Sequence, residues 1–162
     1  MGVSGCGKST IAELLAEEIS AVFCDGDDYH PQSNIDKMAS GTPLTDEDRQ
    51  PWLEKLASVM REGSSPSVTA CSALKKRYRD TLRAAGEAGE VIIVFLQGSK
   101  QLLLDRLIER SRTTDHFMSS SLLDSQLETL EDPSSEDGVI TVSIENSPKE
   151  IISKLTQSIT LS

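Results

Sequence analysis

The feature that most constrains this chain is a glycine-rich segment close to its N-terminus. Gly2-Val3-Ser4-Gly5-Cys6-Gly7-Lys8-Ser9 follows the pattern GxxxxGKS. Glycines at these spacings let the backbone curl tightly, so that successive N–H groups point inward at one anion. The apolar residues that follow recur at helical spacing and predict a helix from about Lys8 to Ser20. Because the N-terminus of a helix also attracts anions, the segment is a predicted phosphate-binding loop.

The segment resembles the Walker A loop of P-loop kinases and NTPases. The resemblance implies that the chain binds ATP and Mg²⁺, with cofactor contacts from Gly2, Val3, Ser4, Gly5, Cys6, Gly7, Lys8, Ser9 and Thr10. Lys8 is then a catalytic residue that holds the β- and γ-phosphates, while the Ser9 hydroxyl binds the metal. The alternative is a glycine-rich tail that fits the pattern by chance. The amphipathic helix directly behind the loop disfavours it.

Alternating strand and helix patterns predict a single α/β domain over residues 1–162. The continuous apolar run from Val91 to Leu96 is typical of a parallel strand that helices cover on both faces. We expect a three-layer P-loop kinase fold, with a mostly parallel sheet flanked by helices. Within it, about 30–62 is the predicted helical substrate-binding region and about 110–121 a predicted lid. Strands are expected at 21–24, 67–74, 91–96 and 139–144, and Pro51 should kink or restart a helix that Thr45 caps.

One element of this fold is missing from the sequence. A phosphate loop normally follows a buried strand, yet only Met1 precedes Gly2. Five apolar strand residues would contribute roughly 7 to 15 kcal/mol, at about 1.5 to 3 kcal/mol each, which is comparable with the stability of a whole domain. We therefore expect either a shortened product, such as an alternative start or splice form, or another segment in the place of the first strand.

Composition excludes several classes of function. The net charge of −10 disfavours nucleic acid and acidic membranes as partners, because a polyanion would meet a repulsive field. The longest apolar run is far shorter than a membrane span, and the N-terminus has no signal or transit pattern, so we expect a cytoplasmic protein.

The three cysteines form no CxxC pair, which disfavours a disulfide framework and a thiolate metal site. Cys6 is either a small loop residue, the simpler interpretation, or a redox-sensitive thiol beside Lys8.

Two carboxylates follow the predicted second strand. Asp25 and Asp27 flank Gly26 at the carboxyl end of that strand, where ligands bind in open α/β sheets. Alternate residues of an extended segment share a side, so one carboxylate can organise Mg²⁺ while the other accepts the proton of an attacking hydroxyl. We assign Asp25, together with Ser9, to the metal and Asp27 to the general base. The alternative is an acidic turn in which both residues only cap.

Several motifs around these residues resemble the gluconokinase family. They are Asp25-Gly26-Asp27-Asp28-Tyr29-His30-Pro31, Asn34-Ile35-Asp36-Lys37-Met38, Gly41-Thr42-Pro43-Leu44, Asp46-Glu47-Asp48-Arg49-Gln50-Pro51-Trp52-Leu53, Cys71-Ser72-Ala73-Leu74-Lys75-Lys76-Arg77-Tyr78-Arg79-Asp80, His116-Phe117-Met118 and Ser125-Gln126-Leu127-Glu128-Thr129-Leu130-Glu131. The resemblance implies phosphate transfer from ATP to the 6-hydroxyl of D-gluconate, in a fold similar to shikimate and nucleoside monophosphate kinases. It also implies that Asp27 is the base, that His30, Arg49 and Lys75 contact this small-molecule substrate, and that the protein forms a homodimer.

A cluster of basic residues fits an anionic acceptor in an otherwise acidic chain. Its members are Lys75, Lys76, Arg77, Arg79 and Arg83. Helical spacing places Lys75 and Arg79 on one face, which we expect to face the ligands, and leaves Lys76 and Arg83 for solvent. For Arg49, the alternative to an acceptor contact is a surface salt bridge with Asp46 or Glu47.

A second group of arginines precedes or lies within the predicted lid. Of Arg106, Arg110 and Arg112, we choose Arg110 as the catalytic arginine that stabilises the transferring phosphoryl group. Asp115 stands where the family usually has glycine before its His-Phe-Met triplet. A structural role is favoured for His116, which has no identified partner.

Two other functions remain as alternatives. The chain could be an impaired or inactive isoform that still binds nucleotide, because the missing strand is central in such sheets. It could also phosphorylate a related small hydroxy acid. A shikimate kinase is disfavoured because the chain contains no Gly-Gly, and a GTPase because it contains no NKxD motif.

Overall fold

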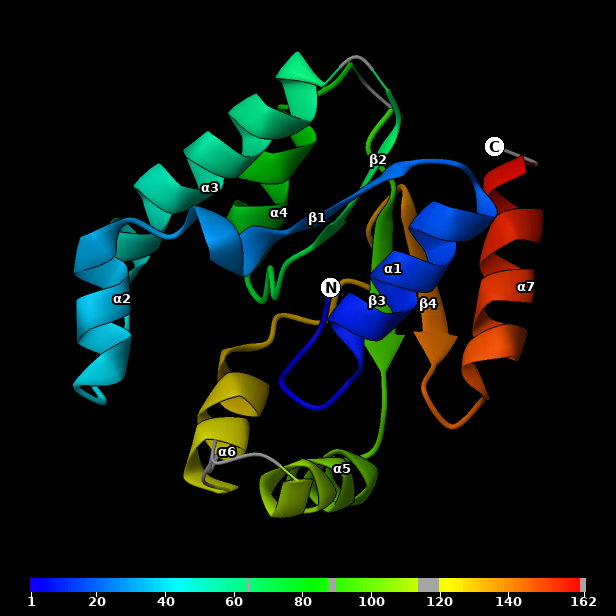
Figure 1. Cartoon of the computed structure of the whole chain (residues 1–162). Helices are drawn as coiled ribbons and strands as arrows, with labels where there is room; N and C mark the ends of the chain where they lie inside the picture. The colour runs from blue at the N-terminus through cyan, green and yellow to red at the C-terminus, as the bar shows by residue number, and fades with distance from the viewer. Residues whose placement is uncertain (64, 88–89, 114–119, 161–162) are drawn as a thin grey trace.

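The computed structural model describes residues 1–63, 65–87, 90–113 and 120–160. In this part of the chain, strands and helices alternate as expected for an α/β protein, with the helices around the strands (Figure 1). The strands are β1 (Val22–Asp25), β2 (Ser67–Ala70), β3 (Ile93–Gln97) and β4 (Val139–Ser143). The helices are α1 (Lys8–Glu18), the 3₁₀ turn η1 (Gly26–Tyr29), α2 (Gln32–Ala39), α3 (Asp46–Glu62), α4 (Lys76–Arg83), α5 (Lys100–Thr113), α6 (Ser120–Thr129) and α7 (Pro148–Thr160).

The strands form two parallel pairs. β1 pairs with β2, with Val22 opposite Ser67, and β3 pairs with β4, with Ile93 opposite Val139. The predicted parallel arrangement is therefore confirmed, but the described residues form two 2-stranded sheets. The predicted strand 67–74 is shorter in the structure, where β2 ends at Ala70, and the φ of 45° at Ala73 is incompatible with a strand that reaches residue 74.

Two apolar clusters hold the helices to these strands. Helices α1 and α7 pack on each other beside β3 and β4, and Leu15, Val142 and Leu155 are among the residues buried there (Figure 1). Helices α3 and α4 pack together on the other side of the molecule, where Trp52 and Leu53 are buried. The elements that carry the predicted acceptor contacts thus have a core of their own.

Helix α3 begins as expected but continues through its proline. The Thr45 hydroxyl accepts a hydrogen bond from the Asp48 N–H, and the Asp48 carboxylate accepts one from the Thr45 N–H, which is a complete capping box. The predicted restart at Pro51 is wrong, because the helix is unbroken from Asp46 to Glu62. Burial of residues just beyond the proline, among them Trp52, offsets its missing hydrogen bond.

The predicted lid, 110–121, is only partly described. Residues 110–113 form the last turn of α5 and α6 begins at Ser120, so both ends of the predicted segment are helical. Asp115 and His116 lie outside the described residues. The lid stays a prediction.

No described segment takes the place of the expected first strand. Met1 alone precedes the glycine-rich loop, and a cavity of about 660 Å³ lies between β2 and β3. None of the described helices is both long enough and apolar enough to cross a bilayer.

Candidate active site

The glycine-rich loop adopts the conformation that its sequence predicts. Gly5 and Gly7 have φ values of 84° and 90°, and α1 begins at Lys8, directly behind them. A Cβ atom on Gly5 would lie 3.0 Å from the Leu103 carbonyl oxygen and 3.1 Å from the Leu107 side chain. Only glycine satisfies both the backbone angle and this close approach to α5. The loop is therefore held between α1 and α5.

Three polar side chains surround this loop. The Lys8 ammonium donates to the Val3 carbonyl, with an Nζ–O distance of 3.2 Å, so it lies over its own loop. Gln126 of α6 accepts a hydrogen bond of 2.7 Å from the Ser4 N–H. Arg106 donates to the Ile144 carbonyl at 2.8 Å, and its other guanidinium nitrogen lies 3.9 Å from where a Cβ on Gly7 would be. Arg106 thus adds a second positive charge at the helix end of the loop.

The two predicted metal ligands lie together. The Ser9 hydroxyl donates to the Asp25 carboxylate at 3.2 Å, and the other Asp25 oxygen accepts the Asp27 N–H at 3.1 Å. Among the described residues, no group of three or more His, Cys, Asp or Glu side chains could hold a metal. A hydroxyl and a single carboxylate suit Mg²⁺ beside a nucleotide, because Mg²⁺ takes one or two protein oxygens and completes its shell with phosphates and water.

Asp27 and His30 face each other across η1. The Asp27 side chain is 84% exposed, whereas that of His30 is 6% exposed, and Asp27 Oδ1 lies 3.8 Å from His30 Nε2. The His30 ring stacks on the Trp52 ring with 4.0 Å between centroids. Burial lowers the pKa of His30 below its usual 6.5, so the imidazole is neutral at pH 7. The two side chains are near each other without a direct hydrogen bond, and the neutral His30 adds no positive charge beside Asp27.

Asn34 sets the tautomer of His30. Its amide nitrogen lies 3.3 Å from His30 Nδ1 and also donates to the Asp48 carbonyl at 2.9 Å. Because an amide nitrogen can only donate, Nδ1 must accept, and the ring proton is on Nε2, on the side of Asp27. Neither Asn34 nor Trp52 has a role that the sequence predicts. One signal could have found Asn34: it follows His30 by four residues, on the adjoining helical turn.

Arg49 and Lys75 lie around the ring of Tyr78. The Arg49 guanidinium carbon is 5.9 Å and the Lys75 ammonium 5.8 Å from the ring centroid. Arg49 donates to the carbonyls of Leu44 and Thr45, so the alternative salt bridge with Asp46 or Glu47 is not what the structure contains. It also contributes to the lowered pKa of His30, so it lies within electrostatic reach of that ring. The structure therefore brings the predicted acceptor residues into one region.

Asp46 already balances the charge of Lys75. Its two oxygens accept from the Lys75 ammonium at 2.9 and 3.0 Å, and Arg77 donates to it at 3.0 Å. The Tyr78 hydroxyl also donates to it. The hydrogen bonds from Tyr78 and Lys75 lower the pKa of Asp46 to about 2.

The rest of the basic cluster is structural, and the expectation that Arg79 faces the ligands is wrong. Arg79 is 0% exposed and donates to Glu136 and to the carbonyls of Ala73, Leu74 and Glu131. Helical spacing places a side chain on a face but does not say which groups that face meets. Lys76 and Arg83 pair with Asp80, and Arg83 also pairs with Glu136.

Arg110 lies on the exposed side of α5. Its catalytic role stays a prediction, whereas Arg106 is the member of this group that the structure places beside the phosphate loop.

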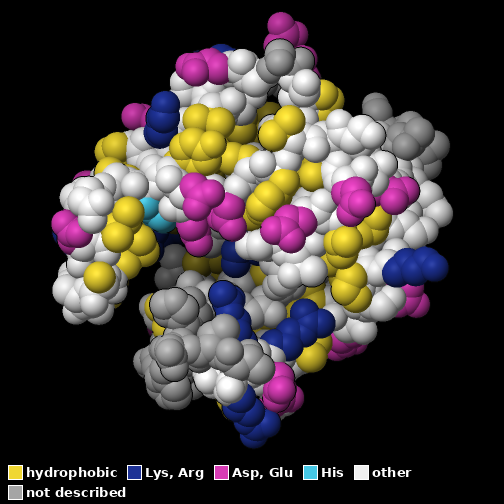
Figure 2. Space-filling view, in the orientation of Figure 1, with side chains coloured by type: hydrophobic (Ala, Val, Ile, Leu, Met, Phe, Trp, Pro, Cys, Tyr) yellow, Lys and Arg dark blue, Asp and Glu magenta, His cyan; other side chains and the backbone are white. Residues whose placement is uncertain are grey.

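The surface of the molecule has a hollow on one face. Figure 2 shows His30, the cyan side chain, at the edge of the hollow that separates the α2 side of the molecule from the α5–α6 side, with acidic side chains next to it. Lys and Arg side chains, in dark blue, lie within and below this hollow. The arrangement can hold a polyphosphate on one side and a small hydroxylated molecule on the other.

Comparison with known proteins places this arrangement in a family. A sequence model described as an AAA domain matches residues 1–133. The gluconokinase of Gluconobacter oxydans is 44% identical, over 96% of this chain and 86% of its own length, and the probable gluconokinase of the mouse is 40% identical, over 98% and 95%. The crystal structure of a gluconokinase from Sinorhizobium meliloti superposes with a TM-score of 0.86 at 43% identity, over 99% of this chain and 93% of that one.

The chain belongs to the gluconokinase family. This finding confirms the resemblance drawn from the acceptor-side motifs, and with it the P-loop kinase fold. The gluconokinase-family assignment also makes the chain a phosphotransferase. It does not test the role of any single residue, so the assignments of Asp25, Asp27 and Arg110 stay predictions.

Proposed function

We propose that this protein transfers the γ-phosphoryl group of ATP to the 6-hydroxyl of D-gluconate. The observation that carries the proposal is the continuous set of contacts from Ser9 through Asp25 to Asp27. It links the phosphate loop to the backbone of Asp27, whose carboxylate is exposed. The identity to gluconokinases over nearly the whole chain supports gluconate as the acceptor.

The chain's own residues supply binding, orientation and proton transfer. In the proposed reaction the gluconate 6-oxygen attacks the γ-phosphorus, the bond from that phosphorus to the β–γ bridging oxygen breaks, and ADP leaves. Asp27 accepts the hydroxyl proton, while the Nε2–H of His30 donates a hydrogen bond to a sugar hydroxyl. Arg49 and Lys75 attract the carboxylate, and Lys8 neutralises the γ-phosphate.

Ser9 and Asp25 would hold Mg²⁺, which fits them because both are oxygen donors already in contact. When bound, the ion neutralises charge on the transferring phosphoryl group. Arg106 or Arg110 would add to this neutralisation, and residues about 30–62 and 110–121 would act as substrate-binding region and lid.

The test is MgATP-dependent release of ADP by the full chain with D-gluconate, shikimate, AMP or no acceptor in parallel. We expect turnover with gluconate only. Asp27→Asn should lower kcat by about 10²- to 10⁴-fold and leave the Kd for MgATP unchanged, while Asp28→Asn, the matched change at an exposed neighbour, should leave both unchanged. If Asp27→Asn is as active as the unchanged protein, Asp27 is not the general base.

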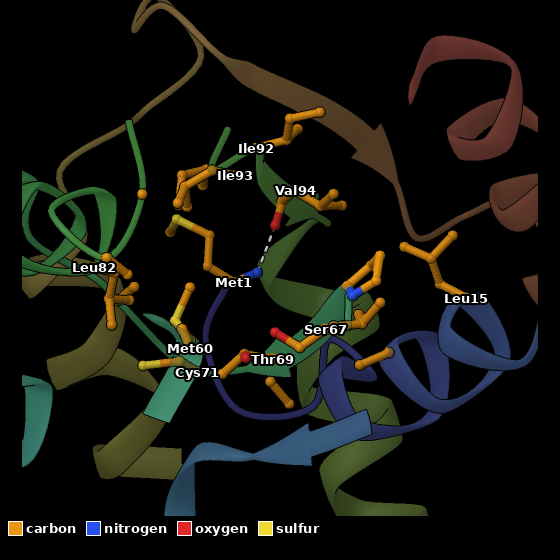
Figure 3. Close-up of a pocket in the computed structure, with 18 of the residues that line it drawn as sticks. Met1, Leu15, Met60, Ser67, Thr69, Cys71, Leu82, Ile92, Ile93 and Val94 are labelled. Atoms are coloured by element: carbon orange, nitrogen blue, oxygen red, sulfur yellow. Dashed lines mark hydrogen bonds between the residues drawn. The ribbon is translucent and has the colours of Figure 1, made fainter. Parts of the chain in front are cut away.

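One observation favours a second candidate, a nucleotide-binding form with impaired transfer. The cavity between β2 and β3 lies directly behind the phosphate loop, because Met1 lines it (Figure 3). Folded protein that gains thermal stability from MgATP, by about 2.7 kcal/mol at a hundred times its Kd, but releases no ADP with gluconate would support this candidate. Cytoplasmic location and a homodimer belong to the proposal through the family, and light scattering tests the dimer.

A further inference from the structure

Helix α6 and the chain that follows it contact both sides of the candidate active site. The Gln126 side-chain oxygen accepts a hydrogen bond of 2.7 Å from the Ser4 N–H of the phosphate loop. Further along, the Glu131 carboxylate accepts a hydrogen bond of 2.6 Å from the Lys76 N–H at the start of α4. Figure 1 shows α6, in yellow, beside the dark blue phosphate loop. Both acceptors belong to one of the motifs that resemble the gluconokinase family, and the proposed reaction gives them no role.

The contact with Gln126 fixes the first half of the phosphate loop. Because a backbone N–H can only donate, the atom of the Gln126 amide that meets Ser4 must be its oxygen. The Cys6 N–H donates within the loop, to the Val3 carbonyl at 3.3 Å. This half of the loop is thus held by protein partners, and a phosphate would meet the N–H groups nearer the start of α1, where Lys8 lies.

The apolar core sets the place of Gln126. Leu123 precedes it by three residues on the same face of α6 and is 1% exposed. Leu123 belongs to the same buried cluster as Val3 and Cys6 of the phosphate loop, so packing anchors α6 to that loop. Because the Gln126 side chain is a neutral amide, it accepts the N–H of the loop without adding negative charge beside the phosphates.

Glu131 binds the backbone on both sides of Lys75. Its N–H donates to the Leu74 carbonyl at 2.9 Å, and its carboxylate accepts from the Lys76 N–H. Lys75 is the N-cap residue of α4 and its own side chain forms no capping hydrogen bond, so Glu131 supplies the cap. A negative charge also suits this end of a helix. Arg79 holds the arrangement in turn, since it donates to the Leu74 and Glu131 carbonyls at 3.1 Å each.

We propose that Gln126 and Glu131 are positioning residues that hold the phosphate loop and Lys75 at a fixed distance from each other. The inference rests on the proposed function, in which this loop binds ATP and Lys75 attracts the acceptor carboxylate. The last turn of α6 joins the two residues, and the Leu130 N–H donates to the Gln126 carbonyl at 3.0 Å, so a rigid turn sets their separation. Phosphoryl transfer needs the acceptor in line with the γ-phosphorus, and a misplacement of about 1 Å can lower the rate about a hundredfold.

Two variants of Gln126 test the nucleotide side. Methionine is similar in length but is only a weak acceptor, so Gln126→Met should raise the Kd for MgATP about 2- to 10-fold and lower kcat with gluconate about 10- to 100-fold. Gln126→Glu keeps an acceptor for Ser4 but adds a negative charge, so its Kd for MgATP should be raised at low salt and return toward that of the unchanged chain at high salt. Titration calorimetry measures these Kd values. Glu128→Gln, at an exposed position of the same helix, is the control and should change neither quantity.

Two variants of Glu131 test the acceptor side. Glu131→Ala removes the cap beside Lys75, so the KM for gluconate should rise about 2- to 10-fold and kcat should fall about 10- to 100-fold, while the Kd for MgATP stays unchanged. Glu131→Gln keeps an oxygen that can accept from the Lys76 N–H, so it should restore most of both values. All four variants should keep Tm within about 5 °C of the unchanged chain, which separates positioning from loss of the fold.

Three results would overturn the inference. They are an unchanged kcat in both Gln126→Met and Glu131→Ala, an equal fall in kcat in Glu131→Gln and Glu131→Ala, and a Kd of Gln126→Glu for MgATP that does not respond to salt. If the unchanged chain does not turn over gluconate, the proposed function fails, and amide hydrogen exchange decides the inference. Exchange should be about 2- to 10-fold faster at Ser4 in Gln126→Met and at Lys76 in Glu131→Ala. Unchanged exchange at both amides would overturn it.

Discussion

The nucleotide side and the acceptor side of the hollow are built in different ways. On the nucleotide side, the loop from Gly2 to Ser9 takes its shape from its own backbone, with φ values near 90° at Gly5 and Gly7. On the acceptor side, His30 is positioned by stacking on Trp52, more than twenty residues away. The comparison teaches that phosphate binding is encoded in one continuous segment, whereas acceptor binding depends on contacts between helices.

The two sides also differ in how their lysines are neutralised. Lys8 donates to a carbonyl, so its charge is not cancelled by that partner, whereas Lys75 is bound by the Asp46 carboxylate. A phosphate arriving at Lys8 replaces a neutral group. A carboxylate arriving at Lys75 must compete with another carboxylate. We therefore expect the loss of the Lys8 charge to lower turnover more strongly than the loss of the Lys75 charge.

The largest effect that tests this comparison is that of Lys8→Ala. It should lower kcat by at least about 10²- to 10³-fold, because it removes a charge that stabilises the transferring phosphoryl group. Steady-state ADP release at saturating gluconate measures it. Lys76→Ala is the control, since Lys76 is exposed and pairs with Asp80. A decrease in kcat for Lys8→Ala that is smaller than the decrease for Lys75→Ala would contradict the comparison.

The next effect is that of Trp52 on the acceptor side. Trp52 is 3% exposed, and its indole N–H donates to the Gly26 carbonyl at 2.7 Å. Trp52→Ala should lower the free energy of unfolding by about 3 to 5 kcal/mol. Trp52→Phe keeps a ring against His30 but leaves the Gly26 carbonyl without this donor. It should lower the free energy of unfolding by about 1 to 3 kcal/mol. Urea denaturation measures both values.

The same pair of variants separates stability from acceptor binding. In Trp52→Phe the KM for gluconate should rise while the Kd for MgATP stays unchanged, because the phosphate loop does not depend on Trp52. A parallel rise in the Kd for MgATP would mean that the two sides are not built independently.

The contrast also explains what the sequence could predict. The loop, the contact of Ser9 with Asp25 and the parallel strands could be predicted, because each depends on local spacing or on a short connection between neighbouring elements. The burial of Arg79 could not, because helical spacing does not say that Glu136 lies above that face. The unbroken path of α3 through Pro51 also depends on packing with other elements, which outweighs a local propensity.

A third prediction concerns the choice between two arginines. Arg106 lies beside Gly7, so Arg106→Ala should raise the KM for ATP by about 10- to 100-fold, the equivalent of a charged hydrogen bond. Arg110→Ala should lower kcat with little change in that KM if Arg110 is the catalytic arginine. Steady-state kinetics at varied ATP separate the two. Equal effects of both variants on kcat alone would contradict the placement of Arg106.

The smallest effect concerns the charge balance at Lys75. Asp46 has its pKa lowered from 3.8 to about 2, so its contribution to stability is complete above pH 4 and is lost as the pH falls through 2. Asp46→Asn should destabilise the protein by about 1 kcal/mol at pH 7, and the difference in Tm should narrow between pH 4 and pH 2. A difference in Tm that does not change with pH would mean that Asp46 acts through its hydrogen bond with Tyr78 and not through its charge. Lys75 would then be as available to an anion as Lys8, and this contrast between the two sides would not hold.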